Sequence, residues 1–283
     1  MAGRNRPTIA LHVTSAGRPH RHTATVTWRL NQEGKPDELF RQIMALTDEA
    51  LRLNPSLAEA HVPRARALLR AGKEEEAKAA IDSALALDPR LTGAFFLRAE
   101  VFRRRMQLAQ AESWYLKFID GTPSAARRSN AYYWMAYMYE TAAWKEPRQW
   151  TAHITKARGA YEKMVEFDPR GAWKLVNFAA FLNDEAADFP AAEKYARRAL
   201  DVMDFPAARY QWAFARYQAL QAEIPKMSDA TLKTACEDIS QATGVTLDEA
   251  ITQSSRYRAI SGRLEIVRAR LAPRAAGGKA TWR

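Results

Sequence analysis

The sequence predicts an all-α protein built from paired helices that repeat at a fixed interval. Three prolines, Pro55, Pro89 and Pro123, are equally spaced along the chain. A fixed period of about 34 residues is typical of stacked helical repeats. Only 12 of the 283 residues are glycine and alanine is abundant, which favours helix. No run of 18 or more apolar residues predicts a membrane-spanning helix.

Two consecutive units match each other position by position. The first runs from Ala58 to Pro89 and the second from Thr92 to Pro123. We count positions from the first residue of each unit, so that Ala58 and Thr92 are position 1. Positions 8 and 20 then carry small residues, positions 11 and 24 carry large apolar residues, and position 32 carries proline. The matched pairs are Ala65 and Ala99, Ala77 and Ala111, Leu68 and Phe102, Ile81 and Tyr115, and Pro89 and Pro123. Proline ends the second helix of each unit because it lacks an N–H and its ring clashes with the preceding turn.

This pattern resembles the tetratricopeptide repeat family over roughly residues 37–220. In that family the small residues let paired helices approach closely, and the large apolar residues fill the space between neighbouring units. The resemblance implies a right-handed superhelical array of about five antiparallel helix pairs. Such arrays generally bind other proteins and rarely catalyse reactions.

Weaker units lie on both sides of the two central ones. Ala136 and Ala157 match positions 8 and 20 of a third unit, but they are further apart in the sequence than the equivalent alanines of the central units. We therefore expect a longer loop around Trp144–Trp150, since loop length costs little in closure entropy. The other helices are expected at residues 37–53, 130–143, 157–169, 172–186, 190–203 and 206–222.

The two ends of the chain are expected to differ from the array. Apolar residues alternate in residues 8–13 and 22–28, which indicates a short β-like segment that can form a hairpin. Ser228 is expected to cap a first C-terminal helix. We divide the chain into a basic N-terminal arm with this hairpin (1–34), a tetratricopeptide-like array (35–222), C-terminal capping helices (223–272) and a basic disordered tail (273–283).

Nothing in the sequence indicates catalysis, and we expect no cofactor. No phosphate-binding loop, nucleophile elbow or dinucleotide fingerprint is present. His12, His20 and His22 lack carboxylates nearby and metal-ligand spacing, so no metal site is expected. The single cysteine, Cys236, cannot form an internal disulfide and fits a reducing cytoplasm. We therefore expect a cytoplasmic, non-enzymatic scaffold or adaptor.

The resemblance also implies which residues contact a partner. The inner, concave face of such arrays is built by first helices, and here that face is predicted to be aromatic in one part and rich in arginine in another. It suits an extended or helical protein segment with apolar anchors and acidic flanks. The alternative is that some of these aromatic residues belong to the core between repeats. The predicted partner-binding residues are Arg66, Arg70, Phe96, Arg103, Arg104, Trp134 and Tyr137.

The family's clamp for the carboxylate of chaperone tails is not present as such. The five clamp positions hold Val62, Arg66, Leu97, Arg127 and Ala131, of which only Arg127 is compatible. Binding of chaperone tails is therefore not expected. A fixed place in a larger complex is a further interpretation, with the N-terminal strands and the Trp144–Trp150 loop as docking points.

The charge of the chain is concentrated at its ends. The net charge is +11. Five arginines and no acid give residues 1–30 a charge of +5, and seven arginines and Lys279 against Glu265 give residues 251–283 a charge of +7. The remaining residues, 31–250, therefore carry −1. Basic ends suggest a nucleic acid or another anionic partner, whereas a solvated tail that confers solubility is the alternative.

If the basic ends bind nucleic acid, the affinity will fall steeply with salt concentration because counterions are released on binding. Removal of residues 1–30 and 272–283 will then abolish binding, which a fluorescence anisotropy titration with labelled DNA and RNA can measure. Equal binding by the truncated and full-length chains would show that the ends are not responsible.

Overall fold

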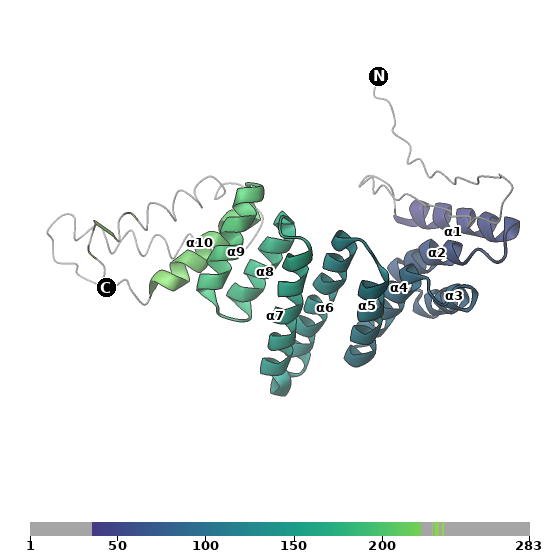
Figure 1. Cartoon of the computed structure of the whole chain (residues 1–283), viewed down its shortest axis with the longest axis horizontal. Helices are drawn as coiled ribbons and strands as arrows, with labels where there is room; N and C mark the ends of the chain where they lie inside the picture. Colours follow the sequence, from purple (N-terminus) through teal and green to yellow (C-terminus); the bar gives the residue numbers. More distant parts are fainter. Residues whose placement is uncertain (1–35, 222–227, 229, 232–233, 235–283) are drawn as a thin grey trace, which may run out of the picture. The chain divides into compact units, whose positions relative to one another are not determined.

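The structure is a computed structural model that describes residues 36–221, 228, 230, 231 and 234. All the elements in these residues are helices (Figure 1). The all-α prediction is therefore confirmed for this part of the chain. The helices are α1 (Pro36–Leu53), α2 (Ala58–Arg70), α3 (Glu74–Leu87), α4 (Thr92–Arg104), α5 (Leu108–Gly121), α6 (Ala125–Lys145), the 3₁₀ turn η1 (Pro147–Gln149), α7 (Trp150–Phe167), α8 (Ala172–Asp184), α9 (Phe189–Val202) and α10 (Pro206–Gln221).

The predictions for the two ends fall largely outside the described residues. This applies to the arm and β-like segment (1–34), the tail (273–283) and most of the capping segment (223–272). In that last segment Ser228 is described, and its hydroxyl accepts a hydrogen bond from the backbone N–H of Thr231 at 3.2 Å. Ser228 therefore makes the predicted cap.

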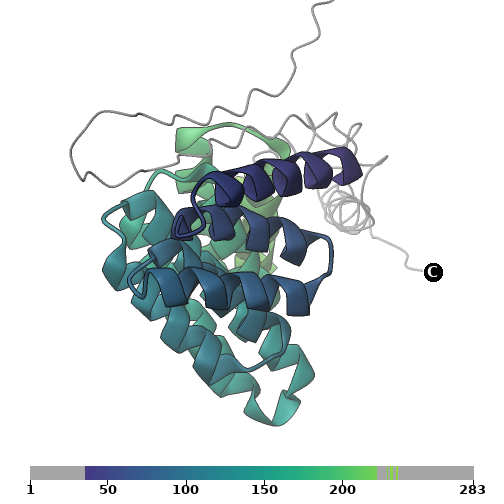
Figure 2. The ribbon, with the colours of Figure 1, turned by 90° about the vertical axis from the view of Figure 1, so that its right-hand side faces the viewer.

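The chain divides into two compact units, residues 1–142 and 143–283, and the boundary falls within α6. In unit 1, α2 packs against α3 and α4 packs against α5 as two helix pairs. Helix α1 lies along α2, as Figure 2 shows, and α4 contacts both α2 and α3. Consecutive pairs thus share one apolar core, as expected for stacked repeats.

Small buried residues allow the paired helices of unit 1 to approach closely. Ala65 and Ala77 of the first pair, and Ala99 and Ala111 of the second, have no exposed surface. Leu68 and Ile81 fill the core beside the first pair and are almost completely buried. The role of the small residues is therefore confirmed in both central units, and the role of the large apolar residues is confirmed in the first.

The turns within the two pairs repeat as well. Gly72 and Met106 occupy equivalent positions in consecutive units, and both have positive φ angles, 75° and 57°. The N–H of the next residue closes each turn, because Lys73 donates to the Leu68 carbonyl and Gln107 donates to the Phe102 carbonyl, both at 2.9 Å. This left-handed helix end suits glycine, and methionine adopts it at a small energetic cost.

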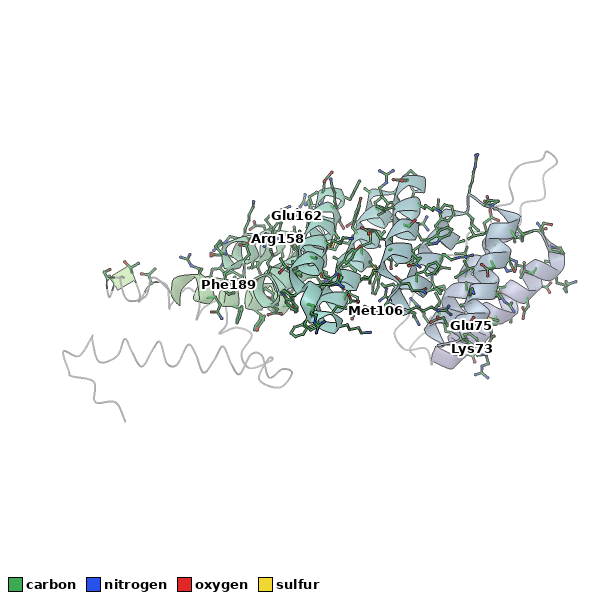
Figure 3. The ribbon with its side chains drawn as sticks, turned by 90° about the horizontal axis from the view of Figure 1, so that it is seen from below. Lys73, Glu75, Met106, Arg158, Glu162 and Phe189 are labelled. Carbon is green, nitrogen blue, oxygen red and sulfur yellow. The ribbon has the colours of Figure 1, made fainter. Side chains whose placement is uncertain are left out.

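The two turns also contact each other through charged residues. Figure 3 marks Met106 in one of these turns and Lys73 and Glu75 at the other. Arg105, next to Met106, forms ion pairs with Glu74 and Glu75.

A charged contact repeats between consecutive units. Asp48 of α1 pairs with Arg64 of α2, and Asp82 of α3 pairs with Arg98 of α4. The two acids are one repeat apart in the sequence, and so are the two arginines. Both acids are largely exposed, so each pair adds little to stability but marks the register between units.

Unit 2 contains the end of α6 and helices α7 to α10. Helix α8 packs against α9, and α10 packs against both of them (Figure 1). In its core the Tyr161 ring of α7 stacks on Phe178 of α8, with ring centroids 5.3 Å apart, and contacts Phe181 at 5.0 Å. Arg158 of α7 donates to Asp188 at 2.9 Å, and Asp188 caps α9 by accepting from the Ala191 N–H at 3.2 Å.

The expected long loop around Trp144–Trp150 is instead mostly helical. Helix α6 continues to Lys145, η1 covers Pro147–Gln149, and α7 begins at Trp150. The additional residues of this unit therefore lengthen its two helices. Ala142 and Ala143 favour continuation of α6, and Pro147 suits the first position of a new helical turn.

No helix in the described residues is long and apolar enough to cross a membrane.

Enlarging a buried alanine will test the close approach of the paired helices. We expect Ala99→Leu to lower the free energy of unfolding by about 1–3 kcal/mol or more, because the added carbons have no space between α4 and its neighbours. Urea unfolding followed by circular dichroism measures this difference. Ala109→Leu, at an exposed position of α5, is the matched control and should change stability by less than about 0.5 kcal/mol. Equal effects of the two changes would contradict this account of the packing.

Candidate functional site

The predicted contact residues all lie on three helices of unit 1. These are α2, α4 and α6, the first helices of successive pairs. Residues three, four or seven positions apart share one side of a helix. This spacing groups the predicted contact residues of each helix on one side of it, except for Arg104. We add Arg127, which lies seven positions before Trp134 on α6. We call the resulting surface the first-helix face, and its residues are Arg66, Arg70, Phe96, Arg103, Arg127, Trp134 and Tyr137.

Arg103 joins α4 to the aromatic residues of α6. Its guanidinium lies over the Trp134 ring, 4.9 Å from the ring centroid, and 5.9 Å from that of Tyr137. The two rings meet edge to face, 6.0 Å apart, and Tyr133 meets Trp134 in the same way at 5.3 Å. Tyr137 is open to solvent, since 43% of its surface is exposed. Three predicted contact residues are thus brought into one cluster.

A buried acid holds Arg103 in place. Both carboxylate oxygens of Glu100 accept hydrogen bonds from Arg103, at 3.0 and 2.8 Å. Glu100 also accepts a hydrogen bond from the hydroxyl of Tyr115, which is fully buried on α5. A two-point contact to a carboxylate fixes the plane of a guanidinium as well as its position. The orientation of Arg103 over Trp134 is therefore set by the buried residues Glu100 and Tyr115.

The pKa values in this network follow from burial and from Glu100. Burial acts to lower the pKa of Arg103, but the hydrogen bonds and the charge of Glu100 outweigh it and raise the pKa. Burial raises the pKa of Tyr115 far above its ordinary value, and the negative charge of Glu100 adds to the effect. Arg103 therefore keeps its charge, and Tyr115 keeps its proton as a donor.

Phe96 lies partly in the core. Its ring contacts Tyr115 at 5.7 Å and Phe118 at 5.2 Å, both edge to face. It is half-buried and packs against the apolar core shared by α2, α3 and α4. The alternative assignment to the core between repeats therefore holds for one side of Phe96.

A second group of charges lies on α2 and α6. Arg66 is half-buried, whereas Arg70, one turn later, and Arg127 are exposed. The Arg127 guanidinium lies 5.7 Å from the centre of the Phe118 ring. Burial lowers the pKa of Arg66, and the charges of Arg70 and Arg127 lower it further. The sequence identifies Arg127 only as a clamp-compatible residue, because its proximity to α2 depends on how the helices stack.

Arg104 is not part of either group. It is exposed in the last turn of α4, and in the described residues it makes no ion pair or ring contact. It follows Arg103 directly and therefore points about 100° away around the helix.

Unit 2 carries aromatic residues of its own at the surface. Trp144 is 64% exposed and meets Trp150 edge to face at 5.2 Å, and its N–H donates to Glu185 at 3.2 Å. Trp173 is 60% exposed and contacts Phe205 at 4.6 Å. The Trp144–Trp150 segment, named above as a docking point, thus presents one tryptophan to solvent.

No group of three or more metal-ligating side chains comes together in the part of the chain that is described. The first-helix face itself is made of guanidinium groups and aromatic rings. Fixed guanidinium groups and partly exposed rings can receive carboxylates and apolar side chains.

Comparisons with known proteins establish the fold. No family model and no curated protein matches the sequence. The solved structure of PilF from Pseudomonas aeruginosa matches with a TM-score of 0.59 at 15% identity, over 80% of this chain and 91% of that one. YrrB, a TPR protein with an unusual peptide-binding site, matches at 0.47 and 16%, over 72% and 97%. MamA from Desulfovibrio magneticus RS-1 matches at 0.45 and 20%, over 60% and 87%. The chain thus has a tetratricopeptide-like repeat fold, as the sequence predicted.

The buried Tyr115 hydroxyl predicts a loss of stability at high pH. An unfolded tyrosine loses its proton near pH 10, whereas the folded pKa lies above that value. The contribution of Tyr115 is therefore complete below about pH 10 and decreases as the pH rises further. Above pH 10, Tyr115→Phe should reduce the fall in the free energy of unfolding by up to about 1.4 kcal/mol per pH unit.

Urea unfolding at several pH values measures this slope for each variant against its own value at neutral pH. Phe118→Leu is the control, since it alters the same core and removes no hydroxyl. An unchanged slope in Tyr115→Phe would contradict the assignment.

Proposed function

We propose that this chain is a non-enzymatic adaptor that holds a segment of another protein on its first-helix face. The observation that carries the proposal is the placement of Arg103 over Trp134 and Tyr137 by a buried acid. If the ion pair between Glu100 and Arg103 served stability alone, it would need no contact with aromatic rings. Here the pair also contacts two aromatic rings through Arg103, and one of them, Tyr137, is 43% exposed.

The composition of the face supports a protein ligand. Tryptophan, tyrosine and arginine contribute most of the binding energy in protein interfaces, because each combines a large contact area with a polar group. A fixed face also reduces the conformational entropy that binding costs. Arg103 is fixed by Glu100, and Trp134 is held between Arg103 and Tyr133.

The face also indicates the chemistry of the bound segment. The rings of Trp134 and Tyr137 suit an apolar or aromatic anchor residue. Arg66, Arg70 and Arg127 suit acids on one side of that anchor, since like charges would be repelled there. We therefore propose a ligand that combines one apolar anchor with flanking Asp or Glu residues. Arg104, exposed beside the face, is proposed as a contact at its margin.

We infer a cytoplasmic location for this activity from the single cysteine, which suits a reducing compartment.

A peptide library displayed on phage and selected against the full-length chain will test this proposal. We expect the selected peptides to share an aromatic or large apolar residue with acidic neighbours. Trp134→Ala should weaken binding of a selected peptide by about 2 kcal/mol, or ~30-fold, because it removes the centre of the face. Isothermal titration calorimetry measures the affinity.

Trp173→Ala is the matched control. It removes a tryptophan that is more exposed than Trp134 but belongs to unit 2 and not to the first-helix face. Circular dichroism verifies that both variants remain folded. Equal loss of affinity in the two variants, or a selection that enriches no common pattern, would overturn the proposal.

A further inference from the structure

Trp144 is held in a fixed, open position where the end of α6, the turn η1 and the start of α7 meet. We call residues 144–150 the tryptophan tip. Trp144 is the most exposed large apolar residue in the described part of the chain, at 64%. The Trp150 ring meets it at 89°, with the ring centroids 5.2 Å apart. The Trp144 N–H donates to Glu185, which follows α8, at 3.2 Å. Contacts from two other elements thus orient a ring that remains open to solvent.

The one acid of the tryptophan tip is turned toward its own chain. The carbonyl of Glu146 accepts the backbone N–H of Gln149, and its carboxylate accepts the Gln149 side-chain amide, both at 2.8 Å. The same carboxylate lies 3.2 Å from Nε2 of the buried His153. Lys145 and Arg148, in contrast, are exposed, and neither forms an ion pair with a described residue. The tip therefore offers two cations to a partner.

The composition of the tip indicates the chemistry of that partner. Residues 144–150 contain no Leu, Ile, Val or Met, so the tip offers aromatic rings and cations without aliphatic side chains. Every base of a single-stranded nucleic acid has a flat face that can stack on an aromatic ring, and every phosphate attracts Lys or Arg. The net charge of +11 attracts the same kind of polyanion to the chain as a whole.

We propose that the tryptophan tip binds single-stranded nucleic acid. A base stacks on the Trp144 ring, and the neighbouring phosphates contact Lys145 and Arg148. This site uses no residue of the basic ends and none of the first-helix face, so it is independent of the protein ligand proposed above. It adds a second binding surface, in unit 2 of the chain.

The first test measures stacking by fluorescence anisotropy, with the full-length chain and a labelled oligothymidine. The matched ligand is a strand of the same length and charge in which the bases are replaced by abasic sites. We expect the wild-type chain to bind the strand with bases about tenfold more tightly, because one stacked base is worth that much affinity.

Trp144→Ala should reduce this preference to less than about twofold, because it removes the stacking ring. Trp173→Ala is the matched control, since it removes a tryptophan of unit 2 that is 60% exposed, and it should leave the preference unchanged. Circular dichroism verifies that both variants remain folded. A wild-type chain without the preference, or a Trp144→Ala variant that keeps it, would overturn the proposal.

The second test measures the phosphate contacts. Lys145→Gln combined with Arg148→Gln should reduce the slope of log affinity against log salt concentration by about 1.4, since each contact on a single strand contributes about 0.7. Lys78→Gln combined with Arg90→Gln removes the same two kinds of charge from exposed positions of unit 1 and should leave the slope unchanged. Equal slopes of the two double variants would contradict the assignment of the phosphates to the tip.

The third test separates nucleic acid from an anionic lipid surface, which also attracts rings and cations. Binding to vesicles of phosphatidylcholine and phosphatidylserine is measured by co-sedimentation. We expect the wild-type chain and Trp144→Ala to behave alike. Loss of vesicle binding in Trp144→Ala would assign the tip to a membrane surface and overturn the proposal.

Discussion

The close contact between paired helices, made through alanines without exposed surface, is the constraint on which the rest of the structure depends. Ala65 against the Ala77 helix, and Ala99 against the Ala111 helix, set how near the helices of each pair lie. That spacing in turn determines where α2, α4 and α6 place the residues of the first-helix face. A larger side chain at these positions would separate the helices and move every residue of the first-helix face. The geometry of the first-helix face is therefore fixed by the smallest residues of the core.

Most of the fold could be predicted from the sequence because its signals are local and repeated. Pro89 and Pro123 mark helix ends, and the alanine positions mark helix contacts, each at the same interval. The stretch around Trp144–Trp150 was interpreted as a loop because the only available measure was the distance between two alanines. Whether additional residues extend a helix or form a loop depends on where the chain stops favouring helix, and Pro147 sets that point later than expected.

The site was less predictable for a physical reason. Spacing on one helix places Trp134 and Tyr137 together, and this needs no knowledge of other helices. The contact of Arg103 with them, and the support that Glu100 receives from Tyr115, involve three helices and arise only from their stacking. The same holds for Arg127, whose charge reaches Arg66 from another helix. Sequence patterns identify the residues of a face, but their neighbours across helices require the structure.

The repeated charged contact has a consequence for how the chain assembles. If every contact between consecutive units were identical, a helix pair could stack one whole repeat away from its correct position. It would meet a similar neighbouring helix in both positions. Asp48–Arg64 and Asp82–Arg98 are equivalent, but the corresponding third positions hold Leu116 and Tyr132. A chain that skipped one pair would set the carboxylate of Asp82 beside a tyrosine and leave Arg98 without its acid. The change in chemistry at the third junction thus disfavours the pairing of α3 with α6 in place of α4.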